Sequence, residues 1–369
     1  MTRSPDRSHS RAGLSPALLT ALLPALSLLL LTACRPDSSG GSGEADATVG
    51  TDEAGVVNLY TARHYDGDEV VYERFTSETG IRVELLEADS AALLERLTRE
   101  GADSPADLFI TVDAGRLHQA EQAGAFQPVR SAVLEERIPE KLRHPEGLWF
   151  GLTKRARVIV YAKDRVDPSE ITTYEDLADP RWKGRIAIRS STNVYNQSLV
   201  ASLIAALGEE ATEEWCRGLV ANLARPPQGG DRDQIRAVAA GEADIAVSNT
   251  YYLAQMLAGS EEDRAAAARV GVVFPNQGGR GTHVNISGGG VVAGAPNRDN
   301  AVRLLEFLAG PEAQSALVAE TREYPVAAGY EAVPELEAFG AFDEDPLNAS
   351  VLGDGGAAAL RLTDRCGWR

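Results

Sequence analysis

The sequence predicts a soluble α/β protein built as two lobes that extended strands connect. Strand-like and helix-like segments alternate along most of the chain, which is typical of a mostly parallel sheet covered by helices. Two long extended stretches, 149–161 and 282–293, interrupt this alternation and suit crossings between two sheets. The length of 369 residues, of which 44% are hydrophobic, is sufficient for two sizeable cores.

The N-terminal 54 residues are predicted to be processing and tether sequence. An arginine-containing start precedes an apolar stretch, 14–31, which prolines interrupt and which ends just before Cys34. This pattern is typical of a lipoprotein signal peptide, 1–33, whose removal leaves a lipidated Cys34; the prolines and modest length disfavour the alternative, a transmembrane anchor. Residues 34–54 are rich in Ser, Gly and acidic residues and predict a flexible tether. We therefore expect an extracytoplasmic protein anchored to the membrane by lipid.

The first part of the folded chain is predicted to alternate regularly. Strands are expected at 56–60, 81–86 and 107–112. Helices are expected at 68–80, 90–101 and 115–124. In the first helix Val70, Val71 and Phe75 share an apolar stripe, and Gly80 suits the residue that follows a helix C-terminus.

The second part follows the extended stretch 149–161, and the stretch 282–293 returns from it. Strands are expected at 185–188, 243–248 and 270–274. Helices are expected at 197–207, 210–219, 232–240, 252–258, 300–308, 312–319 and 357–364. The predicted lobes therefore comprise residues 55–153 with about 283–325, and residues 154–282 with about 326–369.

Five side chains with metal-binding chemistry follow predicted strands. They are His64, Tyr65, Tyr195, Tyr251 and Tyr252. Ligands of open α/β sheets lie outside the carboxyl ends of the strands, so we expect these side chains to converge in one cleft. Taken singly, each residue is explained as well by packing or by ordinary hydrogen bonding, and their shared placement is what favours a site.

The chemistry of these five residues favours ferric iron. Phenolate is an anionic oxygen ligand, tyrosine is a known iron ligand, and imidazole also suits iron. Four phenolates and a neutral histidine around Fe³⁺ sum to about −1, which Arg63 or Arg155 could balance. Calcium would favour carboxylates and carbonyls, and zinc would favour Cys and His, which are scarce here.

Other classes of function are less well supported by the sequence. The formal charge of −18 argues against nucleic acid. An anion or organic solute held by Arg63, Arg155 and Arg157 is the alternative kind of ligand. We expect no enzyme activity, because no nucleophile elbow, P-loop, dinucleotide fingerprint or zinc-protease motif is present.

Two cysteines remain once Cys34 is assigned to the lipid. Cys216 and Cys366 could form a disulfide outside the cytoplasm, or they could be two buried free thiols. The sequence favours neither alternative.

Several short motifs along the chain form a recognisable set. They are 59–65 (LYTARHY), 104–107 (SPAD), 151–157 (GLTKRAR), 182–184 (WKG), 193–198 (NVYNQS), 249–252 (NTYY), 281–285 (GTHVN) and 323–326 (EYPV). Together these motifs resemble the FbpA/FutA-like ferric-iron-binding substrate-binding proteins of bacterial ABC transporters, and the resemblance covers nearly all of residues 56–369. The family implies a transferrin-type, type II periplasmic-binding fold, in which two lobes close over a ligand like a Venus flytrap.

The resemblance also implies the ligands and the partners. Family members place iron ligands at the positions of Tyr65, Tyr195, Tyr251 and Tyr252, and the position of His64 joins them in some. Arg155 resembles the family's cleft arginine. Some relatives use a synergistic carbonate, which we do not expect to be required here. The implied partners are an ABC permease with its ATPase, and we expect a monomer.

One residue departs from the family pattern. Gln255 lies one helical turn after the tyrosine pair, where many relatives carry another arginine. This departure leaves the charge balance of the site, and its preference between Fe³⁺ and Fe²⁺, open.

Overall fold

The computed structural model describes residues 55–63, 65–327 and 329–369. The predicted signal peptide, Cys34, the tether up to residue 54 and His64 lie outside the described residues. Within the described part of the chain, no helix has both the length and the apolar character needed to cross a membrane.

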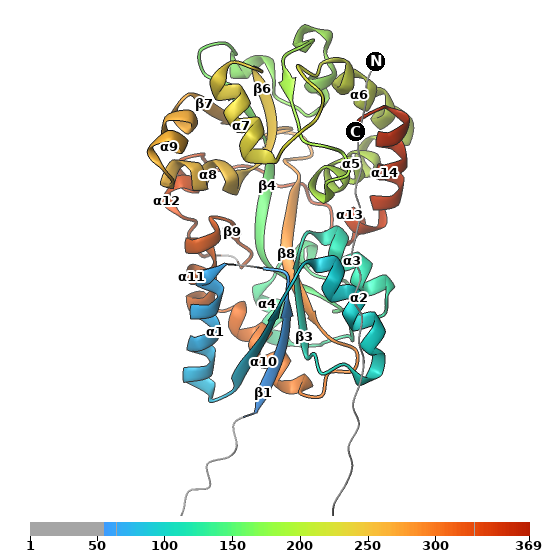
Figure 1. Ribbon diagram of the computed structural model, residues 1–369, viewed down its shortest axis with the longest axis vertical. Helices are drawn as coiled ribbons and strands as arrows, with labels where there is room; N and C mark the ends of the chain where they lie inside the picture. The colour runs from blue at the N-terminus through green and yellow to red at the C-terminus, as the bar shows by residue number, and fades with distance from the viewer. Residues whose placement is uncertain (1–54, 64, 328) are drawn as a thin grey trace, which may run out of the picture. The chain divides into compact units, whose positions relative to one another are not determined.

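The described residues form one nine-stranded sheet. Its strands are β1 (Val56–Thr61), β2 (Arg82–Glu87), β3 (Leu108–Val112), β4 (Phe150–Ala162), β5 (Ile186–Ala187), β6 (Ile245–Asn249), β7 (Val270–Val273), β8 (Val284–Val291) and β9 (Tyr324–Pro325). The strand order is β2-β1-β3-β8-β4-β6-β5, with β7 and β9 also paired to β4. The predicted α/β class is confirmed, because helices follow most of these strands (Figure 1).

The prediction of a mostly parallel sheet was wrong. Among the described residues, β1 pairs in parallel with β2 and β3, and β5 with β6. The other five pairings, all of which involve β4 or β8, are antiparallel. The reason is that β4 and β8 carry the chain out of the first set of strands and back again, so they run in opposite directions.

The helices cover the sheet and agree closely with the predicted positions. They are α1 (Asp66–Thr79), α2 (Ser90–Glu100), α3 (Ala114–Gln122), α4 (Ala132–Arg137), α5 (Val194–Leu207), α6 (Glu209–Ala221), α7 (Asp231–Ala240), α8 (Thr250–Ala258), α9 (Glu261–Ala268), α10 (Arg298–Leu308), α11 (Pro311–Thr321), α12 (Pro334–Glu337), α13 (Ser350–Asp354) and α14 (Gly356–Arg365). Short 3₁₀ helices lie at 101–103, 140–142, 168–170, 175–178 and 180–182. The short helices α4, α9, α12 and α13 were not predicted, because they carry too few turns for a periodic apolar pattern.

The buried side chains form three clusters. The first core packs around β1 and β3, with Leu59, Phe75 and Leu305 among its members. The second and third cores lie on opposite faces of the sheet that β4 and β6 share. Neighbouring residues of β4 show this division, since Ile159 belongs to the second core and Val160 to the third, as the alternation of a strand requires.

The strands β4 and β8 connect these cores and run side by side (Figure 1). Strand β8 contains three glycines, 288–290, and all of its residues are buried. A Cβ atom on Gly290 would lie 2.2 Å from the carbonyl oxygen of Leu148. Glycine is therefore needed where the chain passes over this strand.

Candidate metal centre

Three of the predicted iron ligands lie in the first turns of two helices. Tyr251 and Tyr252 follow β6 directly at the start of α8. Tyr195 lies in the first turn of α5, where the Asn193 side chain accepts a hydrogen bond from the Tyr195 backbone N–H. The helix was predicted to begin only at residue 197. It begins three residues earlier because Asn193 provides the N-cap.

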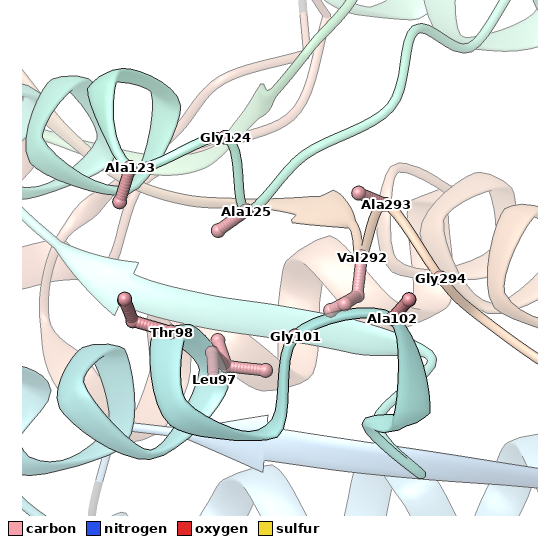
Figure 2. A pocket seen from close by; sticks show the side chains of 10 residues that line it. All are labelled: Leu97, Thr98, Gly101, Ala102, Ala123, Gly124, Ala125, Val292, Ala293 and Gly294. Atoms are coloured by element: carbon pink, nitrogen blue, oxygen red, sulfur yellow. The ribbon is translucent and has the colours of Figure 1, made fainter.

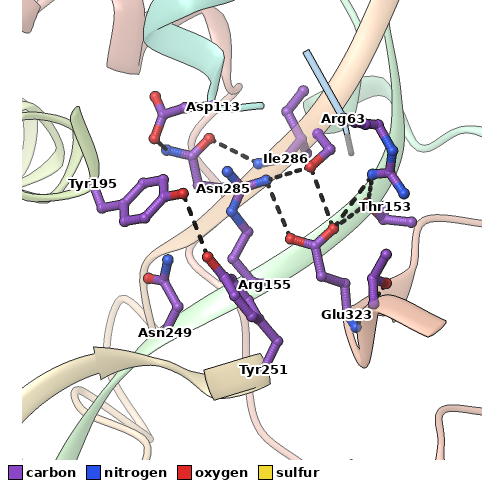
Figure 3. A network of polar contacts seen from close by, with 12 residues as sticks. Arg63, Asp113, Thr153, Arg155, Tyr195, Asn249, Tyr251, Asn285, Ile286 and Glu323 are labelled. Atoms are coloured by element: carbon purple, nitrogen blue, oxygen red, sulfur yellow. Dashed lines mark hydrogen bonds and ion pairs between the residues drawn. The ribbon is translucent and has the colours of Figure 1, made fainter. Parts of the chain in front are cut away.

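The phenol groups of these tyrosines converge. The Tyr251 hydroxyl donates to the Tyr195 hydroxyl over 3.4 Å, and Figure 3 shows the two pointing toward each other. The Tyr251 and Tyr252 rings lie with their centroids 4.2 Å apart. Tyr65 is connected to this group through two arginines. Arg63 lies over the Tyr65 ring and Arg155 over the Tyr195 ring, and the two guanidinium groups lie 3.8 and 3.6 Å from Glu323. Phenols from three separate chain segments therefore belong to one network of contacts.

Burial raises the pKa of Tyr65, Tyr251 and Tyr252, which favours their protonated form in the absence of a cation. It raises the pKa of Tyr252 to about 12, with Tyr195 and Asp231 adding to the shift. It raises the pKa of Tyr251 well above its ordinary value, and the neighbouring Tyr195, Tyr252 and Tyr65 raise it further. The pKa of Tyr65 is raised by burial and by Glu323. Phenols that disfavour one another's ionisation become good ligands only when a cation is placed among them.

Arg155 is a buried cation that lies against this group of phenols. Its guanidinium is almost fully buried and lies over the Tyr195 ring, 5.6 Å from the ring centroid. Its Nη1 donates to the Ser287 hydroxyl over 3.0 Å and lies 3.6 Å from Glu323 (Figure 3). Its Nε has no hydrogen-bond partner among the described residues. Arg155 therefore retains a donor that a ligand could use.

Arg63 and Arg157 are bound within the protein instead. Arg63 forms two hydrogen bonds with Asp68, at 2.7 and 3.0 Å, and stacks over the Tyr65 ring. Arg157 donates to Asp231, Asn249 and Asn196, at 3.0, 2.9 and 2.6 Å. Most donors of both guanidinium groups are therefore used by protein groups around the site, and among the described residues the Nε of Arg157 has no partner.

Two buried acids near the site were not among the predicted residues. Glu323 accepts hydrogen bonds from Thr153 and Ser287 and lies between Arg63 and Arg155 (Figure 3). It belongs to the segment 323–326 that carries the family resemblance, which was the available signal.

The second acid, Asp113, connects the two sides of the site. It has a φ of 82°, an unusual value for a residue other than glycine. Its carboxylate accepts from Ser198 at 2.8 Å and from Asn285 at 2.9 Å. Ser198 lies one turn after Tyr195 on α5, so Asp113 helps to fix the position of that helix.

In the part of the chain that the structure describes, no other donor set competes with the tyrosines. Within the described residues, no three or more His, Cys, Asp or Glu side chains are grouped to hold a metal ion. His283 is buried, and this burial, with Arg157 and Arg155 nearby, lowers its pKa to about 3. It is therefore neutral at physiological pH.

A separate cavity lies between the C-terminal end of α2, the turn after α3 and the segment that follows β8 (Figure 2). Its walls are small or apolar and carry no charge. They are formed by Leu97, Thr98, Gly101, Ala102, Ala123, Gly124, Ala125, Val292, Ala293 and Gly294. Such walls offer no ligand to a metal ion.

A two-part α/β fold with buried tyrosines and an arginine at one site is the arrangement of a solute-binding protein, and comparison with known proteins agrees. Residues 103–347 match the family described as bacterial extracellular solute-binding protein. The chain belongs to this family. Its members bind solutes for transport, in agreement with the expectation that the chain is not an enzyme.

Several relatives within the family carry iron in their names. The chain is 50% identical over 351 residues to iron uptake protein A1 of Synechocystis, covering 95% of this chain and 96% of the relative. It is 30% identical to the Fe(3+)-binding periplasmic protein of Serratia marcescens, covering 81% and 87%. A Trichodesmium FutA (IdiA) structure in complex with iron and citrate ligands is 54% identical, with a TM-score of 0.84, and covers 85% of this chain and 100% of its own. The resemblance to FbpA/FutA-like proteins and the type II periplasmic-binding fold are thereby confirmed.

Proposed function

We propose that this chain captures ferric iron through Tyr65, Tyr195, Tyr251 and Tyr252, with His64 as a fifth ligand. The observation that carries the proposal is the convergence of phenols, above all the 3.4 Å approach of the Tyr195 and Tyr251 hydroxyls. His64 lies outside the described residues, and its role rests on its place next to Tyr65 in the sequence. The names of the relatives support iron as the ligand.

The charges around the site suit this ligand. Coordination by four phenolates would leave about one negative charge on the ferric centre, and Arg155 lies beside Tyr195 to offset it. A synergistic carbonate would bind at the unpartnered Nε of Arg155, but the four phenolates make it dispensable.

The cleft is proposed to lie between two lobes, residues 55–153 with about 283–325 and residues 154–282 with about 326–369. Tyr65 belongs to the first lobe, whereas Tyr195, Tyr251 and Tyr252 belong to the second. Coordination across the cleft would then favour the closed form over the open form. Gln255 of α8 donates to the backbone carbonyl of Thr321 in α11 over 3.0 Å, a contact that would hold the two lobes together.

We further propose that the protein is a monomeric lipoprotein attached through Cys34. It would deliver iron to the permease and ATPase of an ABC importer. The family to which the chain belongs supports an extracytoplasmic location.

The alternative ligand, an anion held by three arginines, has less support. Arg63 and Arg157 already satisfy buried carboxylates, Asp68 and Asp231. Among the described residues, Arg155 and Arg157 each retain only an unpartnered Nε, and such single donors are a poor basis for selecting an anion.

A visible absorption spectrum tests the proposal directly. Protein from residue 35 onward would be titrated with ferric citrate beside the Tyr251→Phe/Tyr252→Phe double variant and a Tyr161→Phe control. A broad phenolate-to-iron band is expected in the wild type and the control, and it should be lost in the double variant. A colourless wild type that does not respond to iron would refute the iron proposal and favour the alternative, an anion bound by the arginines.

A further inference from the structure

Two buried thiols meet at the C-terminal end of the chain. Cys216 lies in α6, and Cys366 follows α14 directly. Both belong to the second core, and Cys216 is fully buried while Cys366 is 9% exposed. Both thiols are free in the structure. The Cys366 thiol donates to the backbone carbonyl of Glu213 over 3.5 Å, which places it against the turn of α6 that carries Cys216. Cysteines on two elements that already pack together in this way can be joined with little movement of the backbone.

The residues that follow Cys366 support the loop that leads to Tyr195. Trp368 is buried, and its Nε1 donates to the carbonyl oxygen of Arg189 over 3.1 Å. The Ser191 hydroxyl donates to the carbonyl oxygen of Trp368 over 2.5 Å. The guanidinium of Arg189 lies over the Tyr195 ring, 5.5 Å from its centroid. A continuous set of contacts therefore runs from the C-terminal tail to Tyr195.

We propose that Cys216 and Cys366 form a disulfide in the extracytoplasmic protein, and that this bond fixes the C-terminal tail that positions Tyr195. Trp368 is then a positioning residue, acting through the backbone of residues 189–191. The disulfide itself is independent of the iron site, whereas the positioning role rests on the proposed function of Tyr195 as an iron ligand.

The oxidation requires a disulfide as oxidant, either a thiol-oxidising protein of the extracytoplasmic space or a small organic disulfide. The Cys366 thiolate, which is the more exposed, attacks the external disulfide and releases one thiolate from it. The Cys216 thiolate then attacks the Cys366 sulfur and releases the second. Two protein thiols are oxidised, and one external disulfide is reduced to two thiols.

Burial of the two thiols determines at which stage they can be oxidised. It raises the pKa of both thiols, so few thiolates exist in the folded protein. Oxidation is therefore expected while the chain folds after export, and the finished bond should resist reduction.

Peptide mapping tests the disulfide. The full chain would be exported to a bacterial envelope, alkylated with iodoacetamide at lysis and digested with trypsin without reductant. Cleavage after Arg189, Arg217 and Arg365 releases the peptides 190–217 and 366–369. We expect these two peptides to be joined, and to separate on reduction. Recovery of both as separate alkylated peptides, or of either joined to another chain, would overturn the proposal.

Iron release tests the positioning role. The Cys216→Ser/Cys366→Ser and Trp368→Phe variants are expected to lose iron to a chelator about fivefold faster, as for the loss of one hydrogen bond, and to show a shifted phenolate-to-iron band. Trp215→Phe is the matched control, since Trp215 packs on Trp368 but donates to Tyr174 instead of the loop. Wild-type release and an unshifted band in both variants would overturn the positioning role. A wild type that binds no iron would refute both the proposed function and the positioning role. The peptide map would still show whether the disulfide forms, because it does not depend on iron binding.

Discussion

Iron binding is expected to release protons, and each phenol that coordinates the metal contributes one. Burial raises the pKa of Tyr252 to about 12, so this phenol is protonated at neutral pH. That pKa lies about five units above pH 7, so ionising Tyr252 without metal costs roughly 7 kcal/mol, at about 1.36 kcal/mol per unit. Ferric iron must supply this free energy. Because protons compete with the metal for the same oxygens, iron affinity is expected to fall as pH falls.

Replacing Tyr252 by Phe removes one of these protons. The variant is expected to release one proton fewer per iron than the wild type, and its affinity should depend less steeply on pH. Calorimetric titration with ferric citrate in two buffers of different ionisation enthalpy measures the proton count. Using the same iron source for every protein cancels the contribution of the chelator.

Tyr72→Phe is the control for this experiment. Tyr72 is a buried phenol on α1 whose pKa burial also raises, but it is not a proposed ligand. Its replacement should leave proton release unchanged. If Tyr252→Phe bound iron with the same proton release as the wild type, Tyr252 would not be a phenolate ligand and the reasoning would be refuted.

Three further substitutions probe the packing around the site. Gln255→Ala removes the hydrogen bond from α8 to α11; the loss of about 1 kcal/mol should make iron release about fivefold faster in stopped-flow mixing with a chelator, and an unchanged rate would exclude a closing role. Asp231→Asn leaves Arg157 buried without its closest carboxylate; the free energy of unfolding should fall by roughly 3 kcal/mol in urea titrations, and a change below about 1 kcal/mol would contradict this. Gly290→Ala places a methyl group 2.2 Å from a backbone oxygen and should destabilise the fold by roughly 1–3 kcal/mol. Its control is Gly356→Ala, where nothing lies near the added Cβ, and equal effects of the two substitutions would refute the steric argument.

The sequence predicted the elements of the fold better than the way they pair. The alternation of strands and helices is a local property that apolar spacing reveals, and the long strand β4 was predicted within one residue at each end. Whether two strands pair in parallel or antiparallel depends on how a segment from far along the chain returns to the sheet. Leu108 of β3 pairs with Val291 of β8, and the sequence around Leu108 contains no pattern that predicts this partner.

The candidate site shows the same division. The tyrosines could be found because two adjacent phenols after a strand are unusual and because the surrounding motifs resemble a family. Asp113 could not be found, because in the sequence it is an ordinary acid between a strand and a helix. Its structural role depends on hydrogen bonds from Ser198 and Asn285, two residues far along the chain that the fold brings next to it.

The composition of the first core has a consequence for how the protein is made. Leu59 near the start of the folded chain packs in the same cluster as Ile286, Leu305 and Leu317. This core cannot be completed until the segment through α11 has been synthesised, since β3 depends on β8 for its second neighbour. Contacts between such distant segments form slowly. A nascent chain of this protein therefore has no finished first core until nearly all of the described residues have been synthesised, although its N-terminal strands are made first.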